Sequence, residues 1–336
     1  MRRTTRRVTA AATLAVVAFT MLGIGSSRAV EGPYPGLPAP EVQPPPASHR
    51  TFGGAALASL AKAETAKQWL RTPVMVTAFD FYISPTTASP DPARYRACST
   101  GGGNVYLVAP SGSPHNYGIS PDITVRTLAF GAIPVEATVR LEQRRADGLP
   151  VPLVGETTTC ALNIPDGGRQ ALDTVIDDEL HTRVTSLVVD GVRIRLGDTC
   201  RTAVPGAMHL RGKGYLAGWD GNQQVDPPKL PLWDKGLFNL STGGRLTGTI
   251  DVPRFGGCVT ADGDDLSSLL TATVSGSAFP LSTNQGSAFG CTKPKPGGGT
   301  LPPGPGESTV ESVPCNPGNA ASPLIPPALE IPESDR

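Results

Sequence analysis

The stretch VEATVRLE at residues 135–142 decides the fold class, because apolar and polar side chains alternate along it without interruption. Successive side chains of an extended strand point to opposite faces, so a period of two indicates a strand with one buried face. Asp147 and Gly148 follow, a pair that readily supplies the positive backbone angles of a tight hairpin turn, and residues 149–164 offer the partner strand. The apolar positions of the first strand are Val135, Ala137, Val139 and Leu141.

A second hairpin is predicted around Asp190 and Gly191. Residues 184–189 precede this pair, and the apolar residues after it alternate with Arg193 and Arg195, which we expect to face solvent. No long helical pattern separates the further candidate strands from one another. These strands are residues 74–83, 104–109, 123–130, 208–216, 245–252 and 269–275.

Strands in succession without crossover helices predict antiparallel pairing, and a sheet with one apolar face must cover it with a second sheet or close on itself. We therefore expect an all-β fold in residues 71–291, an antiparallel β-sandwich. It forms either one large unit or two immunoglobulin-like units divided near residues 200–205. The composition agrees, because 39 glycines, 35 prolines and only 17% charged residues exclude a helical bundle, while 39% hydrophobic residues suffice for a core.

Both ends of the chain differ from this body in composition. Residues 30–50 hold seven prolines and are expected to form an extended spacer. Residues 51–70 contain many good helix formers and no proline, which predicts a short helix. Residues 292–336 hold 11 prolines and 6 glycines, so we expect this tail to be disordered apart from the surroundings of Cys315.

Residues 1–29 have the layout of a secretory signal peptide. Four arginines precede an uncharged apolar run at residues 8–24, and Ser27-Arg28-Ala29 offers small residues at a cleavage site before Val30. The run is shorter than the ~20 residues that span a bilayer, so we expect a secreted, extracellular or envelope-associated protein with no membrane anchor after cleavage. Cleavage would leave 24 basic and 29 acidic side chains, a balance that argues against nucleic-acid binding.

Six cysteines in an exported chain indicate disulfide bonds. They lie at least 24 residues apart and the chain has only four histidines, so we predict no metal site and no cofactor. Fifteen pairings are possible. Our preferred bridge joins Cys258 and Cys291, which flank a predicted hairpin segment, and the remaining pairs would be Cys160 with Cys200 and Cys98 with Cys315.

No arrangement of residues predicts a catalytic site. His181 follows Asp177, Asp178 and Glu179, and a carboxylate could orient its imidazole, but such an acidic run more often forms a solvated turn. The Ser59-x-x-Lys62 spacing arises freely in a helix rich in alanine and lysine. Residues 262–265, DGDD, could bind calcium weakly, although a plain turn is the simpler interpretation.

Aromatic residues near a long loop give the one candidate ligand site. Trp219 and Trp233 flank the loop and Tyr215 lies close by in sequence, so these rings could bind a cell-wall component, a polysaccharide or a protein. The alternative is that both tryptophans cap the core. We favour a non-catalytic binding or structural protein of the cell exterior. The competing hypothesis is an extracellular hydrolase of polysaccharides or esters that uses the carboxylates of Asp177, Glu179 and Asp220.

Several segments resemble secreted, β-rich actinobacterial proteins of unknown function. The resemblance spans roughly residues 120–291, and its most specific elements are Cys200-Arg201-Thr202 and Gly256-Gly257-Cys258. It implies export and disulfide bonds, and it supplies no functional residue. The segments that carry it are RTLAFGAIPVEATV, VDGVRIRLGDTCRT, GGRLTGTIDVPRFGGC and DDLSSLLTATVSG.

Overall fold

The fold is known from a computed structural model of the chain. The predicted signal peptide and residues 30–48 of the predicted spacer lie outside the part that it describes, as do Cys291 and Cys315. The described residues are 49–110, 113, 115, 117–129, 133–163, 169–214, 216–220, 223–225, 232–239, 243–286, 289–290, 293–294, 300–301 and 325–333.

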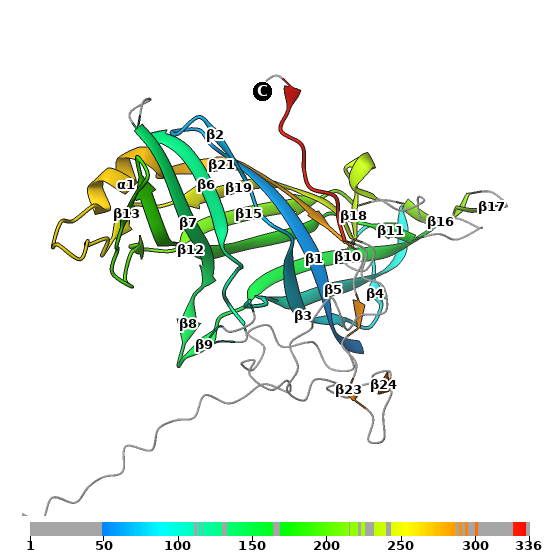
Figure 1. The fold of residues 1–336 in the computed structure, drawn as a ribbon. Coiled ribbons are helices and arrows are strands. Elements are labelled where there is room, and N and C mark those ends of the chain that lie inside the picture. The colour runs from blue at the N-terminus through cyan, green and yellow to red at the C-terminus, as the bar shows by residue number, and fades with distance from the viewer. Residues whose placement is uncertain are drawn as a thin grey trace, which may run out of the picture.

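Eight strands form a closed antiparallel sheet (Figure 1). Each strand pairs with the next strand of the set along the chain, and the last strand pairs back with the first. The all-β antiparallel prediction is therefore confirmed. The strands are β1 (His49–Ala63), β3 (Met75–Ile83), β5 (Tyr95–Leu107), β10 (Leu153–Leu162), β12 (Thr174–Val189), β15 (Gly206–Gly212), β19 (Gly243–Val252) and β21 (Gly276–Gln285).

The predicted β-sandwich is not confirmed, because the sheet covers its apolar face by closing on itself. The pairing of β1 with β21 closes the ring, with Leu57 opposite Gln285 and Ala61 opposite Leu281. Alternation along a strand predicts one buried face, but it does not say whether a second sheet or the far side of the same sheet covers that face.

A second, smaller core adjoins the ring. The second half of β12 continues beyond it and pairs with β7 (Ile133–Gln143), which pairs with β6 (Ile123–Ala129). The strands β13 (Val192–Ile194), β14 (Arg201–Thr202) and β20 (Phe255–Gly256) and the helix α1 (Ser267–Val274) complete this part, and Figure 1 shows α1 and β13 at its end of the molecule. The buried residues of this core are Ile123, Val139, Val184, Cys200, Phe255, Cys258 and Leu270.

The other elements are short. They are β2 (Gln68–Arg71), β4 (Thr87–Ala88), β8 (Arg145–Ala146), β9 (Leu149–Pro150), β11 (Arg169–Ala171), β16 (Leu216–Asp220), β17 (Gln223–Val225), the 3₁₀ helix η1 (Leu232–Lys235), β18 (Phe238–Asn239), β22 (Phe289–Gly290), β23 (Lys293–Pro294) and β24 (Thr300–Leu301).

Both predicted turns are present, but the predicted pairing of residues 135–142 with residues 149–164 is wrong. β7 pairs with β6 and β12, whereas β10 pairs with β5 and β12, so the Asp147-Gly148 turn joins only the short strands β8 and β9. Asp190 and Gly191 have φ values of 48° and 78° and join β12 to β13, and Asp147 and Gly148, at 50° and 81°, join β8 to β9. Positive φ at both central residues is the requirement of the turn that connects two twisted strands most directly.

Two predicted elements are wrong in type. Residues 51–70 form β1 and β2 in place of a helix, because the small side chains of β1 pack between β3 and β21 and this pairing outweighs helix propensity. The predicted strand at residues 269–275 is α1. Its N-terminus is held by Asp265, whose Oδ1 accepts a hydrogen bond from the Ser267 N–H at 2.9 Å, and Leu270 is the buried apolar residue of the helix.

β12 pairs with β10 through Val175 and Ile176 and then diverges from it toward β7. At this fork, side chains form hydrogen bonds with the backbone of the diverging strands. Gln143 is 3% exposed, and its Oε1 accepts the Leu107 N–H at 2.8 Å while its Nε2 donates to the carbonyl groups of Val105 and Val151. Across the fork, the Asp178 carboxylate accepts the Val154 N–H at 2.8 Å. Polar backbone groups that the diverging strands no longer pair are thereby satisfied.

The two disulfide bonds among the described residues differ from the predicted pairs. Cys98 bonds to Cys160 and Cys200 bonds to Cys258, so the predicted bridges of Cys160 with Cys200, of Cys258 with Cys291 and of Cys98 with Cys315 are wrong. Cys98 and Cys160 are direct partners on the neighbouring strands β5 and β10, and Cys200 and Cys258 adjoin the paired strands β14 and β20. Pairing between strands far apart in sequence decides which cysteines meet.

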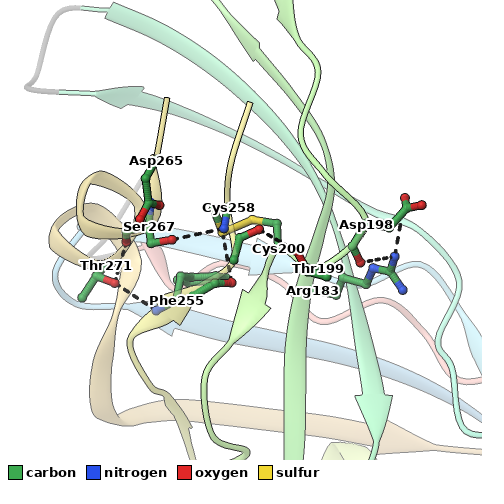
Figure 2. The surroundings of a disulfide bond; sticks show 11 residues. Arg183, Asp198, Thr199, Cys200, Phe255, Cys258, Asp265, Ser267 and Thr271 are labelled. Atoms are coloured by element: carbon green, nitrogen blue, oxygen red, sulfur yellow. Dashed lines mark hydrogen bonds and ion pairs between the residues drawn. A yellow bond between two sulfur atoms is a disulfide. The ribbon is translucent and has the colours of Figure 1, made fainter. Parts of the chain in front are cut away.

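The second disulfide lies against α1 (Figure 2). The Cys258 N–H donates to Ser267 Oγ at 3.1 Å, and the Phe255 N–H donates to Thr271 Oγ1 at 2.9 Å. The hydroxyl of Thr271 in turn donates to the Ser267 carbonyl at 2.7 Å. These bonds hold the helix against β20 and the residues that follow it, which include Cys258.

Part of the predicted disordered tail is ordered. In residues 325–333, Leu329 is 7% exposed, and the Pro327 carbonyl accepts a hydrogen bond from Asn284 Nδ2 at 3.1 Å. The prediction of disorder is therefore wrong for this segment, in which Leu329 is buried and the backbone is hydrogen-bonded to Asn284 of β21.

Candidate functional site

The register of the ring sorts each strand into inward and outward positions. The ring core contains Leu107 of β5 and Leu281 of β21, two strands that do not pair with each other, so the face that carries both residues is the inner one. Following direct partners around the ring then assigns every position. The buried members of the inner core are Leu107, Leu153, Ile176, Leu180, Met208, Leu210, Phe238, Leu246, Ile250, Phe279 and Leu281.

The inner face is almost free of charge. Among the paired inward positions with described side chains, Asp178 is the one acidic or basic residue; His49, at the start of β1, also holds an inward position, and its side chain lies outside the described residues. Burial raises the pKa of Asp178, and two backbone N–H groups, those of Glu179 and Val154, oppose this effect. The interior therefore suits neutral rather than ionic groups.

Glycines dominate one end of the interior. A path around the ring starts at Gly53 and moves from each residue to the residue directly opposite it on the next strand. After one circuit this path returns to β1 at Ala63 rather than at Gly53, so the strands are staggered along the ring axis and tilted, as closure requires. Allowing for this stagger, each strand contributes one inward residue at the same level. We call this set the glycine layer: Gly53, Phe79, Gly103, Gly155, Thr174, Gly212, Gly244 and Gln285.

Thr174 is the unusual member of the glycine layer. Its side chain is 1% exposed, and its Oγ1 makes no hydrogen bond within the part of the chain that the structure describes. Its direct partner on β15 is Gly212, which presents no side chain to it. A buried hydroxyl without a partner is uncommon in native proteins, and it is expected to lower the stability of the fold.

Two phenylalanines of β3 lie on the inner face at the glycine-layer end of the ring, away from Thr174 of β12. Phe79 and Phe81 of β3 are half-buried, although they lie on the inward face, and the Phe81 ring lies over Gly101 beside Thr157. Alternation in residues 75–83 predicts that these rings share one face, but the sequence does not indicate that Gly101 and Thr157 lie next to them. Thr174 carries no sequence signal that distinguishes it from other threonines.

The segment between β15 and β19 folds over part of the layer. Phe238 of β18 is fully buried and its ring lies over Gly212, where a side chain on that glycine would collide with it. Leu232 and Trp233 of η1 are also buried, and Trp233 is 5% exposed. Trp233 thus caps the core, as the alternative interpretation of the sequence had it, and presents no exposed ring for stacking.

The other two predicted aromatic ligands are not placed by the structure. Trp219 lies in β16, whose backbone pairs with β17, but its side chain is outside the described residues. The same holds for Asp220, and Tyr215 lies outside them entirely. A ligand role for Trp219 and Tyr215 stays a prediction.

The acidic run at residues 177–179 is part of β12, so the predicted solvated turn is wrong. Asp177 faces outward from the ring and binds two side chains of β15. Arg211 donates to both of its carboxylate oxygens at 3.0 and 2.9 Å, and His209 Nδ1 lies 2.9 Å from Oδ1. Hydrogen bonds from Arg211 lower the pKa of Asp177, and those of His209 add to this effect. Tertiary pairing overrides the tendency of charged runs to form turns.

His181 is buried and its Nδ1 contacts threonine, while the carboxylate of Glu142, its direct partner on β7, acts on it only through its charge. Its Nδ1 lies 3.1 Å from the carbonyl oxygen and 3.2 Å from Oγ1 of Thr202, which also accepts the Thr182 N–H. Burial lowers the pKa of His181, and the nearby Arg201 charge contributes in the same direction. These contacts give His181 a structural environment between β12 and β14.

The remaining candidate motifs have structural explanations. Ser59 and Lys62 lie on a strand and face opposite sides of it, with Ser59 Oγ 2.9 Å from Thr283 Oγ1 inside the ring, so the helical Ser-x-x-Lys arrangement does not exist. In the DGDD segment, the Thr260 N–H donates to the Asp264 carbonyl at 2.8 Å, which forms a turn before α1. Across the residues with described side chains, no three His, Cys, Asp or Glu groups are placed to hold a metal ion.

No helix within the described residues is long and apolar enough to cross a membrane. Comparisons with protein-family models, with curated proteins and with solved structures each found no match for this chain. The interior of the closed sheet, at its glycine layer, is the candidate functional site.

Proposed function

We propose that this protein is a non-catalytic binding or structural protein of the cell exterior. The observation that supports the proposal most directly is the pair of disulfide bonds, one on the ring and one within the second core. Disulfides form and persist in oxidising compartments, and residues 1–29 carry the pattern of an export signal.

The rigid closed sheet supports a binding or structural role. A closed sheet has no free edge along its ring, and the Cys98–Cys160 disulfide joins two neighbouring strands of it, so the ring presents fixed side chains on its outer face. The proposed ligands outside the ring are a cell-wall component, a polysaccharide or a protein at Trp219 and Tyr215.

The competing hydrolase gains no support from the placement of its carboxylates. Asp177 and Glu179 face outward on the same strand, two residues apart, and Glu179 lies 3.5 Å from Arg144. A glycosidase pair needs one carboxyl group that stays protonated, whereas Arg211 lowers the pKa of Asp177. We therefore do not propose hydrolysis.

Secretion and disulfide pairing are tested together by expressing the chain with its own leader and mapping the peptides of the protein in the medium without reduction. We expect an N-terminus near Val30 and peptides that link Cys98 to Cys160 and Cys200 to Cys258. Protein that stays inside the cell with its leader and four free thiols would overturn the proposal.

Binding outside the ring is tested by retention on purified cell-wall polysaccharide. We expect Trp219→Ala to reduce retention, while Trp69→Ala, a matched change in β2, leaves it unchanged. Equal retention of both variants would remove Trp219 from the proposed site.

A further inference from the structure

The C-terminal segment at residues 325–333 lies against the outside of the ring. Asn284 of β21 contacts it, because its Nδ2 donates a hydrogen bond to the Pro327 carbonyl at 3.1 Å. Leu281 and Gln285 of the same strand face inward, so Asn284 faces outward. Its side chain is nevertheless only 1% exposed, so the outer face of the ring is covered at this point. Figure 1 shows the segment in red, starting beside the end of β21.

The segment is an extended chain with a period of three. Proline fixes φ at about −65° and keeps the residue before it out of helical backbone, and residues 325–332 accordingly belong to no helix or strand. Its two buried residues, Pro326 and Leu329, lie three positions apart, and the others are exposed or partly exposed. Three residues are one turn of a polyproline II helix, so both buried side chains fit on one side of such a helix.

The ring orients the Asn284 amide independently of the segment. Arg245 of β19 is a direct partner of Asn284, and its Nε donates to Asn284 Oδ1 at 3.1 Å. A guanidinium group can only donate, so the amide oxygen must face Arg245 and the amide nitrogen is turned toward the Pro327 carbonyl. The carbonyl groups of a polyproline II helix form no internal hydrogen bonds, so they are available to such a donor.

The segment can leave without opening the ring. Each pairing that closes the sheet joins strands that end before residue 286, and none involves residues 325–333. Residues 291–324, which are rich in proline and glycine, connect the segment to the rest of the chain. The site is therefore occupied by a tethered peptide rather than by a strand of the sheet.

We propose that the outer surface around Asn284 recognises an extended peptide of another protein, with leucine three residues after proline, and that residues 325–333 occupy this site until such a peptide displaces them. This proposal deepens the proposed binding function by naming a class of protein partner. Polyproline II segments are preformed in the free peptide, so they lose little conformational entropy on binding. A tethered segment acts at an effective concentration of about 1 mM, so a free peptide has to compete with it.

The test uses the full chain with both disulfides mapped and a fluorescein-labelled peptide of residues 325–333, whose anisotropy reports binding. In the Leu329→Asp chain the tethered segment cannot dock, because burial of a carboxylate is costly. This chain should bind the peptide at least about tenfold more tightly than the wild-type chain, whose own segment competes. Ile325→Asp, a matched change at a residue that is 61% exposed, should leave peptide binding as weak as in the wild type. A peptide that carries Leu329→Asp should not bind.

A second pair of variants tests the hydrogen bond. In the Leu329→Asp chain, Asn284→Ala should weaken peptide binding by about fivefold, the worth of one neutral hydrogen bond, whereas Ser282→Ala, at the preceding outward position of β21, should not. Circular dichroism melting checks that each variant is folded.

Three results would overturn the proposal. Equal peptide binding by the wild-type and Leu329→Asp chains would show that the segment does not occupy a peptide site. A Leu329→Asp chain that fails to fold would show that the segment is a fixed part of the structure. A wild-type chain that is dimeric by light scattering, beside a monomeric Leu329→Asp chain, would assign the site to a second copy. Secretion and retention through Trp219 are measured separately, so failure here is distinguishable from failure of the proposed function.

Discussion

Replacing Thr174 by valine should stabilise the ligand-free protein, which is the reverse of what the same change does at Thr202. Both side chains are buried, at 1% and 0% exposure, so the substitutions differ in hydrogen bonding rather than in burial. Thr174 Oγ1 has no partner among the described residues, whereas Thr202 Oγ1 accepts the Thr182 N–H at 3.2 Å and lies 3.2 Å from His181 Nδ1.

The magnitudes follow from the cost of burying an unpaired polar group. A buried hydroxyl without a hydrogen bond costs about 1–3 kcal/mol, so Thr174→Val should raise the free energy of unfolding by about 1 kcal/mol after allowing for altered packing. Thr202→Val removes the acceptor of a part-buried N–H and should lower it by about 1–3 kcal/mol.

Urea unfolding at 25 °C, followed by circular dichroism, measures both changes. With a slope of about 3 kcal/mol per molar urea, the midpoint of Thr174→Val should rise by about 0.3 M, and that of Thr202→Val should fall by at least as much. If Thr174→Val lowered the midpoint as far as Thr202→Val, the Thr174 hydroxyl would have a partner in the ligand-free protein, and the reasoning would be refuted.

Two further predictions concern neighbouring charges and close packing. Carbon-13 NMR titration should place the pKa of Asp177 below its ordinary value of 3.8 and that of Asp178 above it. The Asp177 pair with Arg211 should therefore stabilise the fold above the unfolded pKa, and this contribution should disappear as the pH falls through the lowered value. The contribution of Asp178 has the opposite pH dependence: it is present at low pH and is lost as the pH rises through the raised pKa. A raised pKa for Asp177 or a lowered one for Asp178 would contradict the corresponding assignment. Gly248→Ala should destabilise the fold by about 1–3 kcal/mol, because a Cβ there would overlap the His209 carbonyl oxygen, while Gly256→Ala, whose Cβ would lie 3.6 Å from that of Ala203, should be nearly neutral in the same urea assay.

Local patterns predicted the strands and turns, and long-range pairing decided the rest. The alternation at residues 135–142 and the Asp190-Gly191 turn are properties of a few neighbouring residues, and the structure has both. The closure of β21 on β1 depends on strands more than 200 residues apart, so the sequence pattern could not distinguish a closed sheet from a sandwich. The helix expected at residues 51–70 failed for the same reason, since its alanines suit a helix in isolation and a crowded strand in the ring.

The candidate site was the least predictable part. Glycines at scattered positions of five strands form one layer only after the stagger of the closed sheet is known. The burial of Trp233 depends likewise on a loop that folds back over the ring end. The sequence directed attention to aromatic residues in loops, but the half-exposed rings of the described site, Phe79 and Phe81, lie on a strand.

The strand β12 is common to the ring and to the second core, because Ile176 and Leu180 belong to the first and Val184 to the second. One continuous backbone thus runs through both hydrophobic interiors without an intervening linker. Heating should consequently give a single calorimetric transition, in which neither interior melts ahead of the other.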